Sequence, residues 1–211
     1  DRHTMKARLA SDPPTHESAL ALAESAAPHV AILELGTPLI KSAGLSAVTA
    51  IKKARPDKIV FADLKTMDAG ELEADIAFGA GADLVTVLGA ADDSTIAGAV
   101  KAAKKHGKGI VVDLIGVADK AARAQQVIGL GAEFVEMHAG LDEQAQEGYS
   151  LDSLLTDGAA SGVAFSVAGG VNASSIAAVQ ASGAQVAVAG SAIYSADNVG
   201  DAAAALRAAI V

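Results

Sequence analysis

Short apolar runs rich in Val, Ile and Leu recur roughly every 20 to 30 residues along the chain, the spacing of repeated strand and helix units. Most of these runs lack alternating polar positions, which indicates strands that are buried on both faces. Eight strands are predicted, at Lys6–Ser11, Val30–Leu35, Lys58–Leu64, Asp83–Leu88, Gly109–Leu114, Glu133–His138, Val163–Ala168 and Gln185–Ala189.

An alanine-rich amphipathic stretch follows each run and predicts a helix. The eight expected helices span Thr15–Ala27, Gly44–Ala54, Ala69–Gly79, Asp93–His106, Lys120–Gly129, Leu151–Ser161, Ala173–Ser182 and Asp201–Ala209. Glycine precedes Ala and an acidic or amide residue at Gly81, Gly131 and Gly183, where it supplies the left-handed residue that ends a helix. The repeated join indicates an internal repeat of one βα unit. Leu141–Ser150 is the longest expected loop, either a mobile lid or an inserted turn.

Eight such units predict a single (β/α)8 TIM barrel of the α/β class. An open doubly wound sheet is the alternative, but it commonly carries a GxGxxG fingerprint after its first strand, and this sequence has none. A chain of 211 residues that is 51% hydrophobic suits one core. Met5 is the expected natural start, so residues 1–4 are interpreted as an expression remnant and 5–211 as the catalytic barrel domain.

A net charge of -9 argues against nucleic acid and acidic membrane surfaces as partners, because Lys and Arg hold those surfaces. No apolar stretch approaches the roughly 20 residues of a membrane span. The chain has no cysteine, which excludes disulfides and thiolate metal sites and fits a cytoplasmic location.

In a barrel of this kind, catalytic groups lie at the carboxyl ends of the strands. Asp63 and Lys65 are two residues apart and share a face, so Lys65 could stabilise an oxyanion while Asp63 binds a cation, with Asp68 joining them. The alternative is a surface salt-bridge cluster in which Asp68 caps the next helix. Asp12, Asp113 and His138 end other strands, and His138 is the candidate proton carrier.

Glu34 interrupts an apolar strand, where a carboxylate is costly without a cation or several donors. Glu34 and Asp63 could together hold one Mg²⁺, or Glu34 could have a buried partner such as Lys65. Gly169, Gly170, Gly190 and Ser191 follow the last two strands, where this fold binds phosphate; plain turns are the alternative interpretation.

Asp63, Lys65 and Asp68 match the Asp-x-Lys-x-x-Asp motif of the orotidine-5'-phosphate decarboxylase suprafamily. The surrounding sequence resembles the 3-hexulose-6-phosphate synthase family from about Met5 to the C-terminus. The segments that carry this resemblance are Glu34-Leu-Gly-Thr-Pro-Leu-Ile, Asp63-Leu-Lys-Thr-Met-Asp-Ala-Gly-Glu, Val85-Thr-Val-Leu-Gly, Val112-Asp-Leu-Ile-Gly and His138-Ala-Gly-Leu-Asp-Glu-Gln.

The resemblance implies an aldehyde-lyase that condenses D-ribulose 5-phosphate with formaldehyde to D-arabino-3-hexulose 6-phosphate through a Mg²⁺-stabilised enediolate, in the ribulose monophosphate pathway. It implies Glu34 and Asp63 as metal ligands for Mg²⁺, with Mn²⁺ as the alternative ion. It further implies acid–base chemistry at His138, with Lys65 and the metal stabilising the enediolate, and a homodimer in which Asp68 reaches the partner's site. A separate isomerase is a candidate partner.

Two other functions stay open at this point: 3-keto-L-gulonate-6-phosphate decarboxylase and a non-catalytic phosphosugar-binding barrel. The decarboxylase family typically has Glu at the position of Asp113 and a His-Arg-Ser-Arg-Asp segment in place of residues 138–142, which favours the synthase. Arg8 and Ser11 stand in a first strand that is usually apolar in the family, and Ser191 stands where Gly is expected. Arg8 and Ser11 are therefore expected to weaken the barrel floor or displace Asp12.

Overall fold

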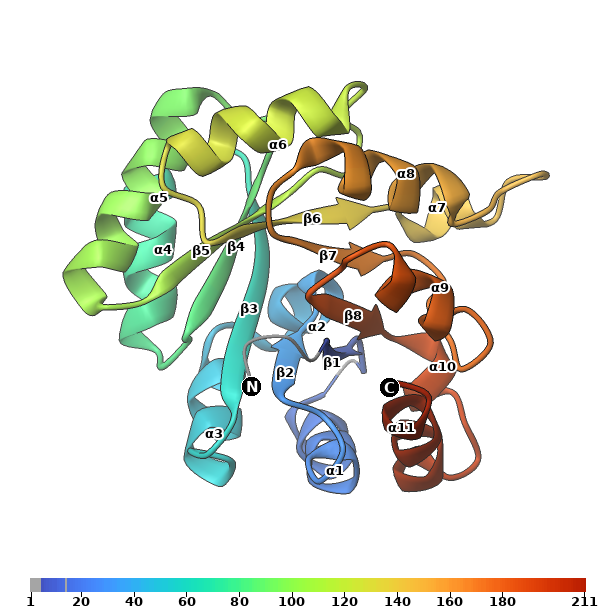
Figure 1. Ribbon diagram of the computed structural model, residues 1–211. Coiled ribbons are helices and arrows are strands. Elements are labelled where there is room, and N and C mark those ends of the chain that lie inside the picture. Colours follow the sequence, from blue (N-terminus) through green and yellow to red (C-terminus); the bar gives the residue numbers. More distant parts are fainter. Residues whose placement is uncertain (1–4, 14) are drawn as a thin grey trace.

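The computed structural model describes residues 5–13 and 15–211, so the expectation for residues 1–4 lies outside the described part. Eight parallel strands form a closed barrel in sequence order, and β1 pairs with both β2 and β8. Figure 1 shows the strands in the centre and the helices around them. The predicted (β/α)8 barrel is confirmed, and the closing pair β1–β8 excludes the open sheet.

The strands run as follows: β1 Lys6–Ser11, β2 Ile32–Leu35, β3 Ile59–Thr66, β4 Leu84–Leu88, β5 Gly109–Asp113, β6 Phe134–His138, β7 Phe165–Ala168 and β8 Val186–Ala189. The helices run as follows: α1 His16–Ala26, α2 Thr37–Ala43, α3 Ser46–Ala54, α4 Gly70–Gly79, α5 Asp93–His106, α6 Lys120–Gly129, α7 Leu141–Gln144, α8 Asp152–Ser161, α9 Ile176–Ala181, α10 Ser191–Tyr194 and α11 Val199–Ala208.

All eight predicted strands and eight predicted helices are present, with ends that shift by a few residues. Gly81, Gly131 and Gly183 have φ of 112°, 108° and 90°, as the glycine joins predicted. The sequence reasoning missed three short helices, α2, α7 and α10, which follow β2, β6 and β8. Helix α7 lies in the segment expected to be a lid or an inserted turn. Each of these helices is only four to seven residues long, too short for a clear apolar periodicity.

The interior of the barrel is apolar at the amino ends of the strands and charged towards their carboxyl ends. Ile32, Phe61, Val111, Phe134 and Val186 belong to one buried apolar cluster. Two residues further along four of these strands stand acids, because alternate residues face the same side: Glu34, Asp63, Asp113 and Glu136. The apolar cluster therefore forms a floor beneath a ring of carboxylates.

The outward-facing strand residues pack against the helices in the larger apolar cluster, which includes Leu9, Leu33, Val60, Val85 and Val112. The pairing register places acids of neighbouring strands at the same level of the barrel. Asp113 on β5, for example, stands opposite Glu136 on β6 in the backbone pairing. Within the described residues, no helix combines the length and apolar character needed to cross a bilayer.

Candidate functional site

Two hollows open at opposite ends of the barrel. The larger, about 1170 Å³, lies at the amino ends of the strands and is lined by Lys6, Lys52, Lys108 and Asp83. The other, about 570 Å³, lies at the carboxyl ends and is lined by ionisable groups from several strands. We assign the functional site to the second because it contains the buried acids and because this end carries the chemistry in barrels of this kind.

Arg8 lies fully buried at the base of this cavity and contacts two acids. Its Nε is 2.7 Å from Glu34 Oε2 but is not aligned for a hydrogen bond, and its Nη2 donates to Glu136 Oε1. The guanidinium carbon stacks 4.1 Å from the centroid of Phe61. Burial opposes the charge of Arg8, but Glu136 and Glu34 raise its pKa, so Arg8 stays cationic. Arg8 therefore bridges acids on opposite sides of the barrel.

Glu34 was expected to have a metal or a buried partner such as Lys65, and the partner in the structure is Arg8. The pKa of Glu34 is nevertheless raised by burial, because one guanidinium shared with Glu136 does not offset the loss of water. Burial raises the pKa of Glu136 as well. Arg8 alone therefore does not stabilise both carboxylates in their ionised forms.

The side chain of Lys65 on β3 contacts one acid of its own strand and one acid of β5. Its Nζ is 2.6 Å from Asp63 Oδ2 and 3.1 Å from Asp113 Oδ2. Burial works against the charge of Lys65, but Asp63 and Asp113 raise its pKa well above the ordinary value. Lys65 has φ of 48°, a left-handed conformation uncommon for a residue with a side chain, where β3 leaves its regular pairing with β4. The predicted sharing of one pocket by Asp63 and Lys65 is confirmed.

Two hydroxyl groups fix the carboxylate of Asp63. Thr86 Oγ1 on β4 donates to Asp63 Oδ1 at 2.7 Å, and Thr37 Oγ1 on α2 lies 3.1 Å from Asp63 Oδ2. Thr37 also donates to the backbone oxygen of Asp63 at 2.8 Å. Helix α2 begins at the Gly36-Thr37-Pro38 sequence, and proline in the first helical turn favours this start. The short helix therefore positions one of the proposed metal ligands.

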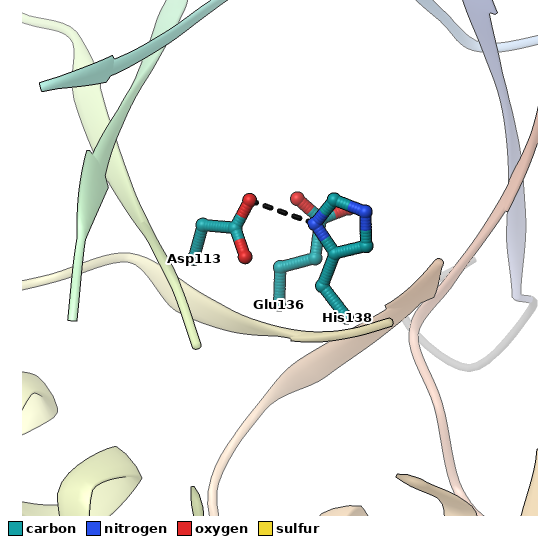
Figure 2. A group of neighbouring side chains, drawn as sticks. All are labelled: Asp113, Glu136 and His138. Atoms are coloured by element: carbon teal, nitrogen blue, oxygen red, sulfur yellow. Dashed lines mark hydrogen bonds and ion pairs between the residues drawn. The ribbon is translucent and has the colours of Figure 1, made fainter. Parts of the chain in front are cut away.

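Asp113 and His138 form a hydrogen-bonded pair beside Lys65 (Figure 2). The distance from His138 Nδ1 to Asp113 Oδ2 is 2.8 Å, and Ile115 N–H donates to Asp113 Oδ1 at 2.9 Å. Burial opposes both charges, yet Asp113 raises the pKa of His138 to about 9, and His138 and Lys65 hold the pKa of Asp113 well below its usual range. Figure 2 shows the second ring nitrogen of His138 pointing away from Asp113.

Asp12 lies at the rim of the same cavity and is half-buried. Burial raises its pKa, the nearby Asp63 adds to the shift, and a hydrogen bond from Tyr194 on α10 opposes it. Asp12 therefore faces the cavity despite the unusual residues before it, so the expectation that Arg8 and Ser11 would displace it is wrong.

The glycines after β7 and β8 also line the cavity, as do Ser191 and part of α7. Gly169 and Gly170 have φ of 141° and 85°, conformations that favour glycine. A Cβ on Gly169 would lie 2.7 Å from the hydroxyl of Tyr149, which donates to the Gly169 oxygen at 2.6 Å. Tyr149 thereby ties the segment after α7 to the loop after β7.

Asp68 does not join Asp63 and Lys65. It is exposed, its Oδ1 accepts a hydrogen bond from the N–H of Ala69 at 2.7 Å, and it is not among the residues that line the cavity. The N-cap of α4 is Ala69, which has φ of 53° and makes no side-chain cap, so the alternative role of Asp68 as the N-cap is wrong too.

The residues around the cavity fit a divalent cation. In the described part of the chain, five acids, Asp12, Glu34, Asp63, Asp113 and Glu136, surround three cations, Arg8, Lys65 and His138. The excess negative charge matches one doubly charged ion with oxygen ligands. Asp113, Glu136 and His138 each offer an atom within 4.8 Å of the others and could hold a metal, but a protonated His138 cannot be a ligand.

Sequence reasoning did not assign a role to Arg8, Glu136, Thr37, Thr86 or Tyr194. Glu136 had a detectable signal, since it precedes His138 by two residues and so faces the same side. Arg8 was noted only as a departure from an apolar strand. Tyr194 had no such signal, because the helix that carries it was not predicted.

The chain matches the family model described as Orotidine 5'-phosphate decarboxylase / HUMPS family over residues 6–206. It is 67% identical to a 3-hexulose-6-phosphate synthase of Mycobacterium gastri over 98% of this chain and 100% of that protein. A crystal structure of 3-hexulose-6-phosphate synthase superposes with a TM-score of 0.98 at 67% identity, covering 98% of this chain and 100% of the other. The 3-keto-L-gulonate-6-phosphate decarboxylase of Vibrio cholerae superposes with a TM-score of 0.85 at 30% identity, covering 98% of this chain and 97% of the other.

The pair His138–Asp113 predicts a pH-dependent contribution to stability. Because the pKa of His138 is raised from 6.5 to about 9 in the folded state, the pair stabilises fully below pH 6.5 and the gain is lost as the pH rises through 9. A double-mutant cycle of His138→Gln and Asp113→Asn should give a coupling free energy of up to about 3 kcal/mol at pH 6.

Urea unfolding at pH 6 and at pH 10.5 measures this coupling. It should fall by more than half at the higher pH, where the imidazole is neutral in both states and only a hydrogen bond from a neutral donor remains. An equal coupling at both pH values would mean that the bond does not depend on the charge of His138.

Proposed function

The chain belongs to the orotidine 5'-phosphate decarboxylase / HUMPS family, and from this membership we propose that it condenses D-ribulose 5-phosphate with formaldehyde to D-arabino-3-hexulose 6-phosphate. The observation that carries the proposal is the 67% identity over the whole length of a 3-hexulose-6-phosphate synthase, and the cavity of buried acids around Lys65 supports it. The reaction is that of a carbon–carbon lyase acting on an aldehyde, and it fixes formaldehyde in the ribulose monophosphate pathway.

The reaction moves one proton and forms one bond. A proton leaves C1 of the pentulose phosphate, the resulting enediolate carbon attacks the formaldehyde carbon, and the formaldehyde oxygen takes up a proton. His138 accepts the C1 proton in its neutral form, which is the minor form near pH 7 because Asp113 raises its pKa to about 9, and the imidazolium then returns a proton to the new hydroxyl. Asp113 orients the ring through Nδ1, so the other nitrogen serves the substrate.

Lys65 supplies a fixed positive charge for the enediolate oxygens. Asp63 and Asp113 keep it protonated and hold its position before substrate arrives, so little reorganisation is needed as charge develops. Asp12, which accepts a hydrogen bond from Tyr194 and lines the cavity, would accept a further hydrogen bond from a substrate hydroxyl.

Glu34 and Asp63 would hold Mg²⁺, with Mn²⁺ as the alternative ion. Bound there, the ion would supply Lewis-acid chemistry, lowering the cost of negative charge on substrate oxygens by several kcal/mol. Burial raises the pKa of Glu34 although Arg8 lies beside it, so a further positive charge there would stabilise its ionised form, which supports a divalent ion at this place. The loops after β7 and β8 would bind the phosphate on their cavity side, at Gly169, Gly170, Gly190 and Ser191. The side chains of these residues are absent or small, so a phosphate can approach their backbone N–H groups.

We further propose a homodimer in which Asp68 completes the partner's site. Three apolar side chains beside it are exposed in the single chain: Met67 by 55%, Leu72 by 62% and Ile76 by 52%. Leu72 and Ile76 lie four residues apart on α4 and share one face. An apolar surface next to an acid outside its own cavity supports pairing with a second copy. An isomerase partner and the cytoplasmic location stay predictions.

The activity assay compares formaldehyde consumption with D-ribulose 5-phosphate and Mg²⁺ in the wild type and in Asp63→Asn. The substitution should lower kcat/KM by at least about a hundredfold, because it removes a ligand charge and a partner of Lys65. Asp57→Asn, at an exposed loop at the other end of the barrel, should retain full activity and serves as the matched control.

Carbon dioxide release from 3-keto-L-gulonate 6-phosphate without formaldehyde uptake would instead assign the chain to the decarboxylase. No turnover in either assay would favour a phosphosugar-binding barrel.

Mixing two inactive variants tests the shared site. Asp68→Ala and His138→Ala, co-refolded in equal amounts, should recover about a quarter of wild-type activity, since half of the dimers would contain one intact site of two. Each variant alone should be nearly inactive. Activity of the mixture no greater than the sum of the two variants would place Asp68 in its own subunit's chemistry or outside it.

A further inference from the structure

Arg8 carries a positive charge and lies in contact with Glu34, one of the two proposed ligands of the divalent ion. It is fully buried, is fixed by Phe61 below and Glu136 across the barrel, and lines the base of the cavity. It therefore cannot leave Glu34 by moving into water. Any ion that binds Glu34 must do so with the guanidinium in place.

The contact with Arg8 makes the two carboxylate oxygens of Glu34 different from each other. Oε2 lies 2.7 Å from Arg8 Nε in an ion pair that is not aligned as a hydrogen bond, and within residues 5–13 and 15–211 no hydrogen bond is made to Oε1. Asp63 is similarly committed, because Thr86 donates to one of its oxygens and Lys65 to the other. Each of these two acids is therefore expected to bind a cation through one oxygen only. Arg8 and Lys65 lie beside the acids and add two fixed positive charges.

We propose that Arg8 is a specificity-determining residue for the cation: by occupying Oε2 of Glu34 it favours a small ion that accepts single carboxylate oxygens and excludes Ca²⁺. The inference rests on the proposed function, since it concerns the same metal site. Arg8 acts through Glu34 and is not expected to touch the substrate.

The preference follows from the coordination habits of the ions. Mg²⁺ and Mn²⁺ bind through one or two carboxylate oxygens and complete an octahedron with water and substrate oxygens. Ca²⁺ takes about six to eight oxygens and commonly uses both oxygens of a carboxylate. With Arg8 present, a two-oxygen contact from Glu34 would require breaking a buried ion pair, which is strongly unfavourable.

A purely structural role would also account for a buried Arg between two acids, so the test must separate stability from selectivity. Replacing Arg8 by Gln frees Oε2 and raises the proton affinity of Glu34, which weakens the binding of every cation at neutral pH. The ratio of the Ca²⁺ and Mg²⁺ dissociation constants is not affected by this competition, because both ions displace the same proton. The ratio therefore reports what Arg8 does to the geometry of the site.

Isothermal titration calorimetry with Mg²⁺ alone and Ca²⁺ alone gives this ratio for the wild type, Arg8→Gln and Arg8→Lys. We expect Arg8→Gln to shift the ratio towards Ca²⁺ by about tenfold, the effect of one additional oxygen contact worth roughly 1.4 kcal/mol. Arg8→Lys keeps a charge beside Glu34 and should stay within about twofold of the wild type.

Thermal unfolding followed by circular dichroism establishes that each variant is folded before titration. If Arg8→Gln alone does not fold, the double variant Arg8→Gln/Glu136→Gln removes the second unpaired buried acid and keeps the same question for Glu34. A folded variant with an unchanged ratio would overturn the role of Arg8. Failure of the wild type to bind either ion, or binding that Glu34→Gln does not alter, would instead overturn the proposed metal site.

Discussion

The closed barrel brings five acids to one end of the molecule and must keep them there away from bulk water. Glu34, Asp63, Asp113 and Glu136 are each at most 5% exposed, and the apolar floor below them offers no compensating donors. Two protein cations make this arrangement tenable: Arg8 between Glu34 and Glu136, and Lys65 between Asp63 and Asp113. The geometry of the site depends on this arrangement, in which each buried cation lies between two buried acids.

The same constraint explains the chemistry. Because the acids outnumber the cations, His138 is drawn into its charged form, Lys65 is kept charged, and the pocket has capacity for a divalent ion. Each group is held by strands of a rigid barrel, so positive charge is already in place where an enediolate would develop. The proposed synthase reaction needs little more than this, since formaldehyde itself presents almost nothing to bind.

Much of this architecture was predictable from the sequence. Eight buried apolar runs separated by alanine-rich helices specify the barrel, and the two-residue spacing of Asp63 and Lys65 places both in one pocket. The partner of Glu34 was not predictable from local pattern, because Arg8 is 26 residues away and meets Glu34 only when β1 pairs with β2. The exposed position of Asp68 was not predictable from its spacing to Asp63 and Lys65, because both Lys65 and Ala69 adopt the left-handed conformation, which residues with a side chain rarely adopt.

In the proposed site, Glu34 and Asp63 bind a divalent ion in addition to contacting Arg8 and Lys65, whereas Asp113, Glu136 and His138 contact Lys65 and Arg8 and serve proton transfer. A crystal structure with Mn²⁺, with the ion located by its anomalous scattering, tests this most directly. One peak is expected beside Glu34 and Asp63, with the His138–Asp113 bond intact. A peak among Asp113, Glu136 and His138, with that bond broken, would contradict it.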